Sequence, residues 1–477
     1  MDNGSSDVLV RDTWDTIPEE VRDEFLARRV GLADASAFGR QAPDRRWTPL
    51  RPVVLEERAY RALESIVGRL LELAIDSCRR RASTLGELHR VLRFRDDLPL
   101  MDPDAPLVTS ELTSCARPDI LIENGRPRLV EFNIGTRIGG GTNAPRMAHE
   151  FTRLVPQSGL YPPQSTVTAR AEAMVRVLGG EVGNDQPRRL AIPAYWTIDE
   201  SGERVHNRKV KKPILSDVQK VGFEVVRTDL DELHQDDSGR LLAADVPVDL
   251  VLVQWGCNET AHMVDKDSGL AALRDADRAG TVEVYPRTES AMINSKVILA
   301  WLHEDADAGL LTPADQELVR NHIPRTTSLG LTGAAAGPGA DASREANGER
   351  DDMVFKPAVG KAGNGVLFGS RTSEQDWQSA AADDPQELPA ILQQRVTPDR
   401  VTLTFLDRES GEQVDASVPF LLSPFLIDGA AADVSVRHMT PDVPDHDVII
   451  SVDHGGCWNT VVLLADRDEE RMSSPAV

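Results

Sequence analysis

The chain has 477 residues, which is too long for one typical domain and predicts two or three. Hydrophobic residues make up 40% of it and charged residues 27%, a composition typical of soluble globular proteins. Its 53 basic and 77 acidic residues give a formal net charge of −24, which argues against a nucleic-acid backbone as the main partner.

The chain begins with MDNGSSDVLV, which is polar and acidic and lacks the basic and apolar segments of a signal peptide. No apolar run approaches the roughly 20 residues of a membrane span. The four cysteines are scattered and form neither a zinc signature nor a disulfide framework: Cys78, Cys115, Cys257 and Cys457. We therefore expect a cytoplasmic protein with reduced thiols, and neither a membrane nor nucleic acid as its partner.

Residues 56–92 predict helical structure. Their apolar side chains, from Leu63 to Leu71, recur at the i, i+3, i+4, i+7 spacing of a helix that buries one face. We expect the first 105 residues to form a mainly helical N-terminal cap.

The stretch RPDILIENGRPRLVEFN, residues 117–133, predicts two short strands around Asn124-Gly125. Side chains alternate between the two faces of a strand, so the register of the hairpin decides which of them meet. Pro127 lacks an N–H and fits poorly beside a tight two-residue turn. We therefore expect a loop of odd length.

An odd-length loop pairs Asp119 with Glu131 and Arg117 with Asn133 on one polar face of the hairpin. Two facing carboxylates repel each other unless a positive charge lies between them. Oxygen ligands of this kind suit Mg²⁺ bound to substrate phosphates, and the planar arginine side chain matches phosphate oxygens. The pattern indicates a magnesium-phosphate site; the alternative is a solvated hairpin face with a surface ion pair.

The next segments differ in rhythm. Residues 135–147, GTRIGGGTNAPRM, predict a glycine-rich loop that leads into a helix. Between residues 187 and 290, strands alternate with helices, which is typical of a parallel sheet in a Rossmann-like unit. No G-x-G-x-x-G opens its first helix, so we expect no typical dinucleotide site. Residues 328–352 are rich in Gly and Ala and predict a mobile loop, either a lid or an inert insertion.

The stretch MVFKPAVGKAGNGVLFG, residues 353–369, predicts a strand, a glycine loop and a second strand, with Lys356 ending the first. Three glycines bracket Lys361: Gly360, Gly363 and Gly365. Glycines let backbone N–H groups approach phosphate oxygens, and lysine adds positive charge. The segment is not a P-loop, because Ala362 follows Lys361. Together with the polar hairpin, it favours a site for nucleotide phosphates.

These motifs resemble ATP-grasp enzymes of the circularly permuted kind, similar to the synthetase domain of glutathionylspermidine synthase. In that family the Arg-x-Asp and Glu-x-Asn strands precede the lysine-bearing strands. Here RPD and EFN likewise precede NSKVILAWL and FKPAVGKAGNG, and the resemblance covers roughly residues 115–145 and 285–440. It implies an α/β (α+β) ATP-grasp fold, circularly permuted, with a Rossmann-like pre-ATP-grasp domain and a helical N-terminal region. We expect a cap (1–105), a core with the metal-binding hairpin (106–160 and 401–477), the Rossmann-like domain (161–290) and an ATP-binding lid subdomain (291–400).

The resemblance also implies the cofactors, ATP and two Mg²⁺ ions, and the roles of single residues. Three oxygen ligands would bind the metal ions: Asp119, Glu131 and Asn133. Two arginines would contact the transferring phosphoryl group and the acyl-phosphate: Arg117 and Arg437. The nucleotide would be held by Lys296, Lys356, Lys361, Gly360, Gly363, Gly365 and Gln394. For the adenine side Gln393 competes with Gln394, Lys361 alternatively faces solvent, and Arg437 is alternatively a surface arginine.

The implied activity is that of an ADP-forming carbon–nitrogen ligase, which makes an amide or peptide bond through an acyl-phosphate. Its substrates would be a small carboxylate and an amine that are amino-acid, peptide or polyamine-like. The candidate residues for carboxylate binding follow the Glu-x-Asn strand: Thr136, Arg137 and Gly139. Two alternatives stay open, an ATP-grasp kinase or phosphotransferase and a non-catalytic nucleotide-binding module.

Overall fold

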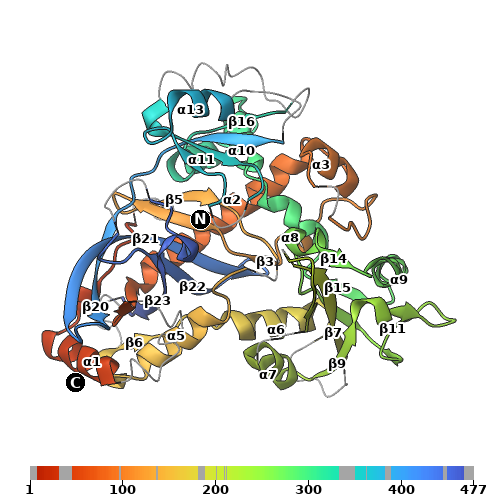
Figure 1. Cartoon of the computed structure of the whole chain (residues 1–477), viewed down its shortest axis with the longest axis horizontal. Coiled ribbons are helices and arrows are strands. Elements are labelled where there is room, and N and C mark those ends of the chain that lie inside the picture. The colour runs from red at the N-terminus through yellow and green to blue at the C-terminus, as the bar shows by residue number, and fades with distance from the viewer. Residues whose placement is uncertain are drawn as a thin grey trace, which may run out of the picture.

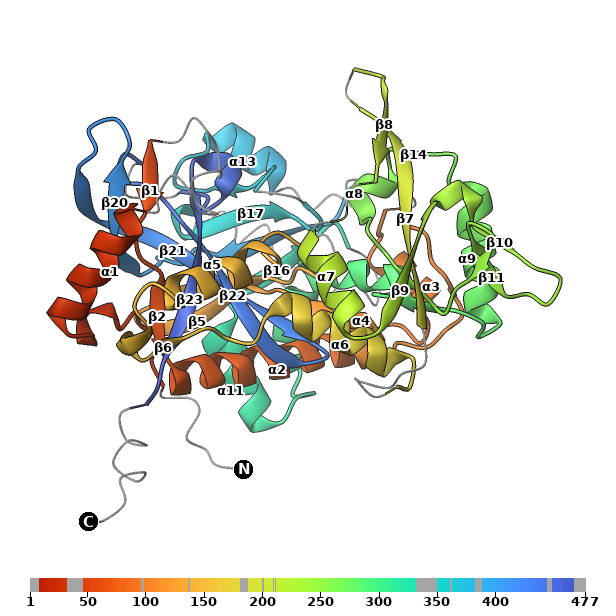
Figure 2. The ribbon, with the colours of Figure 1, turned by 90° about the horizontal axis from the view of Figure 1, so that it is seen from below.

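The computed structural model of the chain is shown in Figures 1 and 2. It describes residues 8–31, 46–95, 98–135, 138–180, 188–199, 201–208, 210, 212–331, 350–360, 363–381, 388–443 and 448–466. Within these residues, three larger sheets with helices packed against them make a mixed α/β architecture. In Figure 1 the central sheet lies to the left, the second sheet at the lower right and the third at the top.

The central sheet runs in the order β1-β20-β21-β22-β23-β2, with four short strands paired at its sides. Its N-terminal strands are β1 (Trp47–Pro49), β2 (Val53–Glu56), β3 (Cys115–Ala116), β4 (Asp119–Glu123), β5 (Arg126–Glu131) and β6 (Leu160–Tyr161). Its C-terminal strands are β20 (Arg400–Asp407), β21 (Gln413–Ile427), β22 (Ala430–His438) and β23 (Cys457–Leu464). The first 105 residues therefore do more than cap the molecule, because β1 and β2 extend this sheet on either side.

Helices cover both faces of the central sheet. On one face, α2 (Glu57–Arg79) buries its apolar stripe against β22 and β23, as Leu63 and Val461 show. On the other face lie α5 (Asn143–Thr152) and α1 (Glu19–Gly31), whose Phe151 and Phe25 rings stack at 5.6 Å. Two short helices, α3 (Leu85–Val91) and α4 (Thr109–Leu112), connect α2 to the hairpin.

The second sheet has a parallel core, as the alternating pattern predicts. Its parallel strands are β7 (Arg188–Ile198), β9 (Phe223–Asp229), β13 (Leu250–Leu252) and β15 (Glu283–Tyr285). Two antiparallel strands pair with the end of β7: β8 (Arg204–Asn207) and β14 (Met263–Val264). Helices α6 (Thr166–Val177) and α7 (Lys212–Lys220) share one apolar cluster with this sheet, and α9 (Asp267–Arg278) shares another. The short helix α8 (Cys257–Thr260) follows β13, and a small ribbon joins β10 (His234–Gln235), β11 (Leu241–Ala243) and β12 (Val246–Pro247).

The third sheet runs β16-β19-β17-β18 and is antiparallel. Its strands are β16 (Thr326–Leu329), β17 (Met353–Pro357), β18 (Leu367–Phe368) and β19 (Ala390–Gln394). One face of this sheet packs on α13 (Glu374–Ala380) through the buried Trp377. On the opposite face, Ile391 belongs to the apolar cluster that includes α10 (Val297–Asp307) and α11 (Pro313–His322). Helix α10 also contacts α2, so this sheet is attached to the central one.

The turn of the β4–β5 hairpin has two residues, and the prediction of an odd-length loop is wrong. Glu123 pairs with Arg126, and Asn124 and Gly125 between them have φ angles of 53° and 76°. Positive φ at both central residues is typical of the type I′ turn that Asn-Gly favours. Pro127 is tolerated because it lies in β5, beyond the turn.

A β-bulge in the same hairpin restores the pairing that the odd-length loop was expected to give. The register shifts between Asp119 and Ile120, so that Ile120 faces Leu129 while Asp119 faces Glu131. Val130 is the extra residue of the bulge. The prediction that Asp119 and Glu131 are cross-strand neighbours is therefore confirmed, for a different geometric reason.

No helix in the described ranges is both long enough and apolar enough to cross a membrane.

Candidate active site

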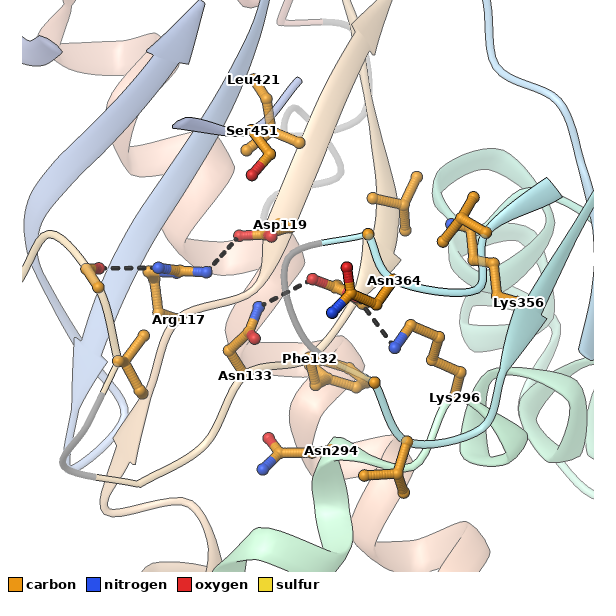
Figure 3. Close-up of a pocket in the computed structure, with 18 of the residues that line it drawn as sticks. Arg117, Asp119, Phe132, Asn133, Asn294, Lys296, Lys356, Asn364, Leu421 and Ser451 are labelled. Carbon is orange, nitrogen blue, oxygen red and sulfur yellow. Dashed lines mark hydrogen bonds and ion pairs between the residues drawn. The ribbon is translucent and has the colours of Figure 1, made fainter. Parts of the chain in front are cut away.

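A cavity of about 710 Å³ lies where the three sheets meet. This is within the range of roughly 300–1,000 Å³ that small-molecule sites occupy. The β4–β5 hairpin, β17 and β19, and the loops that follow β13 and β15 all contribute to its lining. Figure 3 shows its centre, with Asp119 on β4 and the lysines reaching in from the third sheet and from the start of α10.

Asp119 is buried and fully engaged by cationic and hydroxyl donors. Its Oδ1 accepts hydrogen bonds from Arg117 Nη2 at 3.0 Å and from Ser423 Oγ at 2.8 Å. Its Oδ2 lies 2.5 Å from Arg437 Nη2, and the same nitrogen donates to Ser423 Oγ at 3.2 Å. Burial alone raises the pKa of a carboxyl group, but Arg117 and Arg437 outweigh it and hold the pKa of Asp119 well below its usual range.

Glu131 lies beside Asp119 but has a different set of partners. Lys296 Nζ forms an ion pair with Glu131 Oε2 at 3.1 Å, and Asn133 Nδ2 lies 3.4 Å from Glu131 Oε1 (Figure 3). The Glu131 side chain is 28% exposed, whereas that of Asp119 is 4% exposed. Of the two carboxylates, Glu131 is thus the one more open to an incoming ligand.

Lys356 reaches the cavity from β17 and is held by a glutamine of the neighbouring strand. Its Nζ donates to Gln393 Oε1 at 2.6 Å, and Gln393 Nε2 donates to Thr326 Oγ1 at 3.1 Å. Burial lowers the pKa of Lys356 to about 8, although Glu131 acts in the opposite direction. The structure places Gln393 on Lys356, while the side chain of Gln394 is exposed at the end of β19 and also lines the cavity.

The glycine loop borders the cavity at Gly360 and Gly363. Gly363 has a φ of 82°, and a Cβ there would lie 2.6 Å from the side chain of Ile449, so a larger residue would not fit without movement. Gly365 has a φ of 74°. Lys361 lies outside the described residues.

The predicted carboxylate-binding segment is described only in part, because Thr136 and Arg137 lie outside the described residues. The carbonyl oxygen of Gly139 accepts a hydrogen bond of 2.7 Å from Arg117 Nη1. A Cβ on Gly139 would lie 3.0 Å from the Trp458 ring, so glycine permits this close approach. Gly139 therefore orients Arg117 through its backbone, and it also lines the cavity.

Three residues of this centre were not predicted from the sequence: Ser423, Asn294 and Trp458. Ser423 is fully buried and is the only hydroxyl residue in the apolar run VPFLLSPFLI, a signal that could have singled it out. Asn294 accepts from the Ile134 N–H at 2.5 Å and donates to the Ile134 carbonyl at 3.3 Å, which ties the chain before Lys296 to the hairpin. The Arg437 guanidinium lies 6.0 Å from the centre of the Trp458 ring.

The charges of the centre suit a polyanion. Four cationic side chains surround two carboxylates: Arg117, Arg437, Lys296 and Lys356 against Asp119 and Glu131. This local excess of positive charge occurs in a chain with a net charge of −24. Arginine and lysine donors converging in a cavity are the groups that bind phosphate oxygens.

The donor set also fits Mg²⁺, which prefers oxygen ligands. Asp119 and Glu131 are paired across the strands, and Asn133 follows two residues after Glu131. Among the described residues, no group of three or more His, Cys, Asp or Glu side chains is placed to hold a metal ion. A metal site here would therefore need the Asn133 oxygen, water or ligand phosphates beside the two carboxylates.

Comparisons with known proteins show that the fold of this chain is similar to that of solved structures. Neither the protein-family models nor the curated protein sequences gave a match. Among solved structures, the chain is similar to a glutathione synthetase-like effector from Globodera pallida in its apo form, with 13% identity and a TM-score of 0.51. That similarity covers 93% of this chain and 95% of the effector. A provisionally named gamma-glutamylcysteine synthetase from Methylobacillus flagellatus matches at 12% identity and a TM-score of 0.39, over 72% of this chain and 79% of that one. The mixed α/β fold of the chain thus resembles, along nearly its whole length, that of a glutathione synthetase-like protein.

Proposed function

We propose that the chain is an ATP-dependent carboxylate–amine ligase with a circularly permuted ATP-grasp fold, which forms an amide or peptide bond and releases ADP and phosphate. The observation that carries the proposal is the convergence of four cations on the Asp119–Glu131 pair inside one cavity. The likeness of the fold to a glutathione synthetase-like protein supports it, as does the order of the Arg-x-Asp, Glu-x-Asn and lysine-bearing strands in the sequence.

Each charged residue of the centre has a role in this proposal. Lys296 and Lys356 bind the phosphates of ATP, and the glycine loop closes over them. Asp119, Glu131 and Asn133 would hold two Mg²⁺ ions, which would supply positive charge against the phosphate oxygens. Gln393 positions Lys356 through the 2.6 Å hydrogen bond between them.

The reaction then needs charge neutralisation more than covalent participation by the protein. An oxygen of the substrate carboxylate attacks the γ-phosphorus, the bond to the β-γ bridging oxygen breaks, and ADP leaves. The neutral amine attacks the acyl carbon, the carbon–oxygen bond to phosphate breaks, and inorganic phosphate leaves as the nitrogen loses one proton. Arg117 and Arg437 stabilise the negative charge on the transferring phosphoryl group and on the acyl-phosphate.

The test is ADP release from Mg²⁺-ATP with acids and amines supplied singly and in pairs, with mass spectrometry of the products. The ligase reaction requires both substrates and yields a condensed product. ADP release with the acid alone and a stable phosphorylated product would instead identify a kinase. ATP binding without any ADP release would identify a nucleotide-binding module.

A matched pair of variants links this activity to the site. Lys296→Ala removes a cation that is 7% exposed beside Glu131, while Lys220→Ala removes one that is 71% exposed on α7. Only the first is expected to reduce ADP release, by about 10²-fold or more, because it removes a charge that contacts the phosphates. Equal activity of the two variants would contradict the assignment of the site.

A further inference from the structure

One side of the cavity belongs to the parallel sheet and has a lining unlike that of the charged centre. We propose that this side, which we call the apolar arm, binds an uncharged apolar side group of one of the two substrates. The described residues that define the arm are Leu98, Pro99, Val253, Trp255, Pro286 and Ala291. This inference rests on the proposed function, because it concerns the same site and names the class of substrate.

The topology of the parallel sheet places the arm where ligands bind in folds of this kind. Strand β9 pairs with one side of β7, and β13 pairs with the other, so the strand order reverses between β7 and β13. Ligands of open parallel sheets bind outside the carboxyl ends of the strands at such a reversal. Three of the six arm residues come shortly after β13 and β15, namely Val253, Trp255 and Pro286.

The polar residues around the arm are engaged with the protein itself. Thr288 Oγ1 donates to the Pro99 carbonyl at 2.6 Å, and Ser290 Oγ donates to the Arg287 carbonyl at 2.6 Å. The side-chain amide of Asn294 accepts a hydrogen bond from the Ile134 N–H and donates one to the Ile134 carbonyl. These groups shape the arm, but their hydrogen bonds are already made.

The charged residues of this side are engaged too. Arg287 Nη1 binds Asp277 at 2.6 Å, and Arg287 Nε lies 3.8 Å from Glu289. Glu259 Oε2 accepts from the Gly256 N–H at 3.0 Å at the start of α8. A substrate ammonium or carboxylate in the arm would have to compete with these contacts, whereas an apolar group would only displace water.

Trp255 is the aromatic residue of the arm. Its side chain is 4% exposed, its ring meets that of Tyr195 edge-on at 6.1 Å, and its Nε1–H has no hydrogen-bond partner among the described residues. A buried indole N–H usually finds a partner. This nitrogen is itself buried, so Trp255 offers the arm apolar surface, which suits an aliphatic or aromatic group. Polyamine-like substrates fit this lining poorly.

The experiment measures binding and turnover separately. Calorimetric titrations in the presence of a non-hydrolysable Mg²⁺-ATP analogue use four probes: L-leucine, L-phenylalanine, L-lysine and spermidine. The same four are tested in the paired ADP-release assay. We expect the apolar probes to bind at least about tenfold more tightly than lysine and spermidine, because an ammonium group without a partner is costly to bury in an apolar lining.

Two variants locate the effect. Ala291→Leu fills the arm and should weaken the binding of the apolar probes about tenfold or more. Trp255→Phe keeps an aromatic ring and should weaken them less. The affinity for the ATP analogue, which reports on the charged centre, should stay unchanged in both variants and shows that they are folded.

Two results would overturn the inference. One is tighter binding of lysine or spermidine than of leucine and phenylalanine, especially if Glu259→Gln abolishes it, because the arm would then recognise an ammonium group. The other is an Ala291→Leu protein that binds all four probes as the wild type does. Apolar probes that bind as expected without any ADP release would refute the ligase function and leave the apolar arm standing.

Discussion

The two carboxylates of the centre should respond differently when their charge is removed. Asp119 accepts from Arg117, Arg437 and Ser423, so the Asp119→Asn substitution leaves one oxygen for three donors and turns an amide N–H₂ toward a guanidinium. Removing one partner of a buried ion pair costs about 3–5 kcal/mol, because the remaining charge is left uncompensated. We expect the Asp119→Asn protein to lose about that much in its free energy of unfolding at pH 7.

Glu131→Gln is the matched control on the opposite strand. The Glu131 side chain is 28% exposed and faces the cavity, and the glutamine oxygen can still accept from Lys296. We expect a loss of about 1 kcal/mol, the scale of a single hydrogen bond to a charged group in contact with water. Both variants should lose ADP release, by about 10²–10⁴-fold, because each removes a charge that compensates the transferring phosphoryl group.

The assay is urea unfolding combined with native-state hydrogen exchange of the β4 and β5 amides, which reports on the local unit. The pKa of Asp119 is held low, so its contribution to stability is present above pH 4 and is lost as the pH falls further. The difference between wild type and Asp119→Asn should shrink accordingly below pH 4. Equal destabilisation by Asp119→Asn and Glu131→Gln would refute the reasoning, since the two sites differ in burial and in the number of arginines.

Three further predictions concern single side chains. Burial lowers the pKa of Lys356 to about 8, so the affinity for ATP should fall by up to about tenfold per pH unit above pH 8. Calorimetric titration should show a flatter dependence of this affinity on pH for Lys356→Arg, because arginine stays charged. Identical pH profiles of the two proteins would exclude Lys356 as a phosphate ligand. Burial raises the pKa of Asp433 to about 7, so the folded state keeps a proton between about pH 4 and 7 that the unfolded state releases, and stability falls as the pH rises through that window. In urea unfolding, the free energy of unfolding of Asp433→Asn should not fall over this range, so that relative to wild type it gains up to about 4 kcal/mol between pH 4 and pH 8. A parallel pH dependence of the two proteins would contradict this prediction. Ser423→Ala should lower kcat about tenfold with little change in ATP affinity, because it removes the hydroxyl group that bonds both Asp119 and Arg437. Ser423→Thr, which keeps a hydroxyl group, should restore kcat.

The polar hairpin shows how far the sequence determines the site. Strand alternation together with an assumed odd-length loop predicted that Asp119 meets Glu131, and the pair is observed. The odd-length loop was chosen against a regular two-residue turn and is wrong, because a β-bulge, which strand alternation does not reveal, brings the same residues together. Asn124-Gly125 in fact followed its local preference, and the bulge at Val130 absorbed the mismatch.

Contacts between segments far apart in the chain could not be predicted from the sequence. Gln393 and Gln394 are adjacent and chemically identical, and only the pairing of β19 with β17 and β16 decides that Gln393 contacts Lys356 and Thr326. Similarly, β2 is a short strand of three apolar residues and Glu56, and its place beside β23 depends on a partner about 400 residues later. The helical periodicity that follows it is local, and there the prediction of α2 agrees with the structure.

The ion pairs of the centre make nucleotide and metal binding interdependent. Arg437 and Lys296 are each held by one of the carboxylates proposed to bind Mg²⁺. A phosphate that draws these cations away would leave Asp119 and Glu131 without counter-ions, and a metal ion that takes the carboxylates would leave the cations without theirs. Each ligand alone therefore creates uncompensated charge in a buried place, which is unfavourable.

The two ligands together simply exchange partners, with the cations moving to phosphate oxygens and the carboxylates to metal. Such coupling is reciprocal, so the nucleotide must raise the affinity for Mg²⁺ by the same factor by which Mg²⁺ raises the affinity for the nucleotide. In such a centre the cations and carboxylates neutralise one another until both parts of the proposed metal–nucleotide complex arrive.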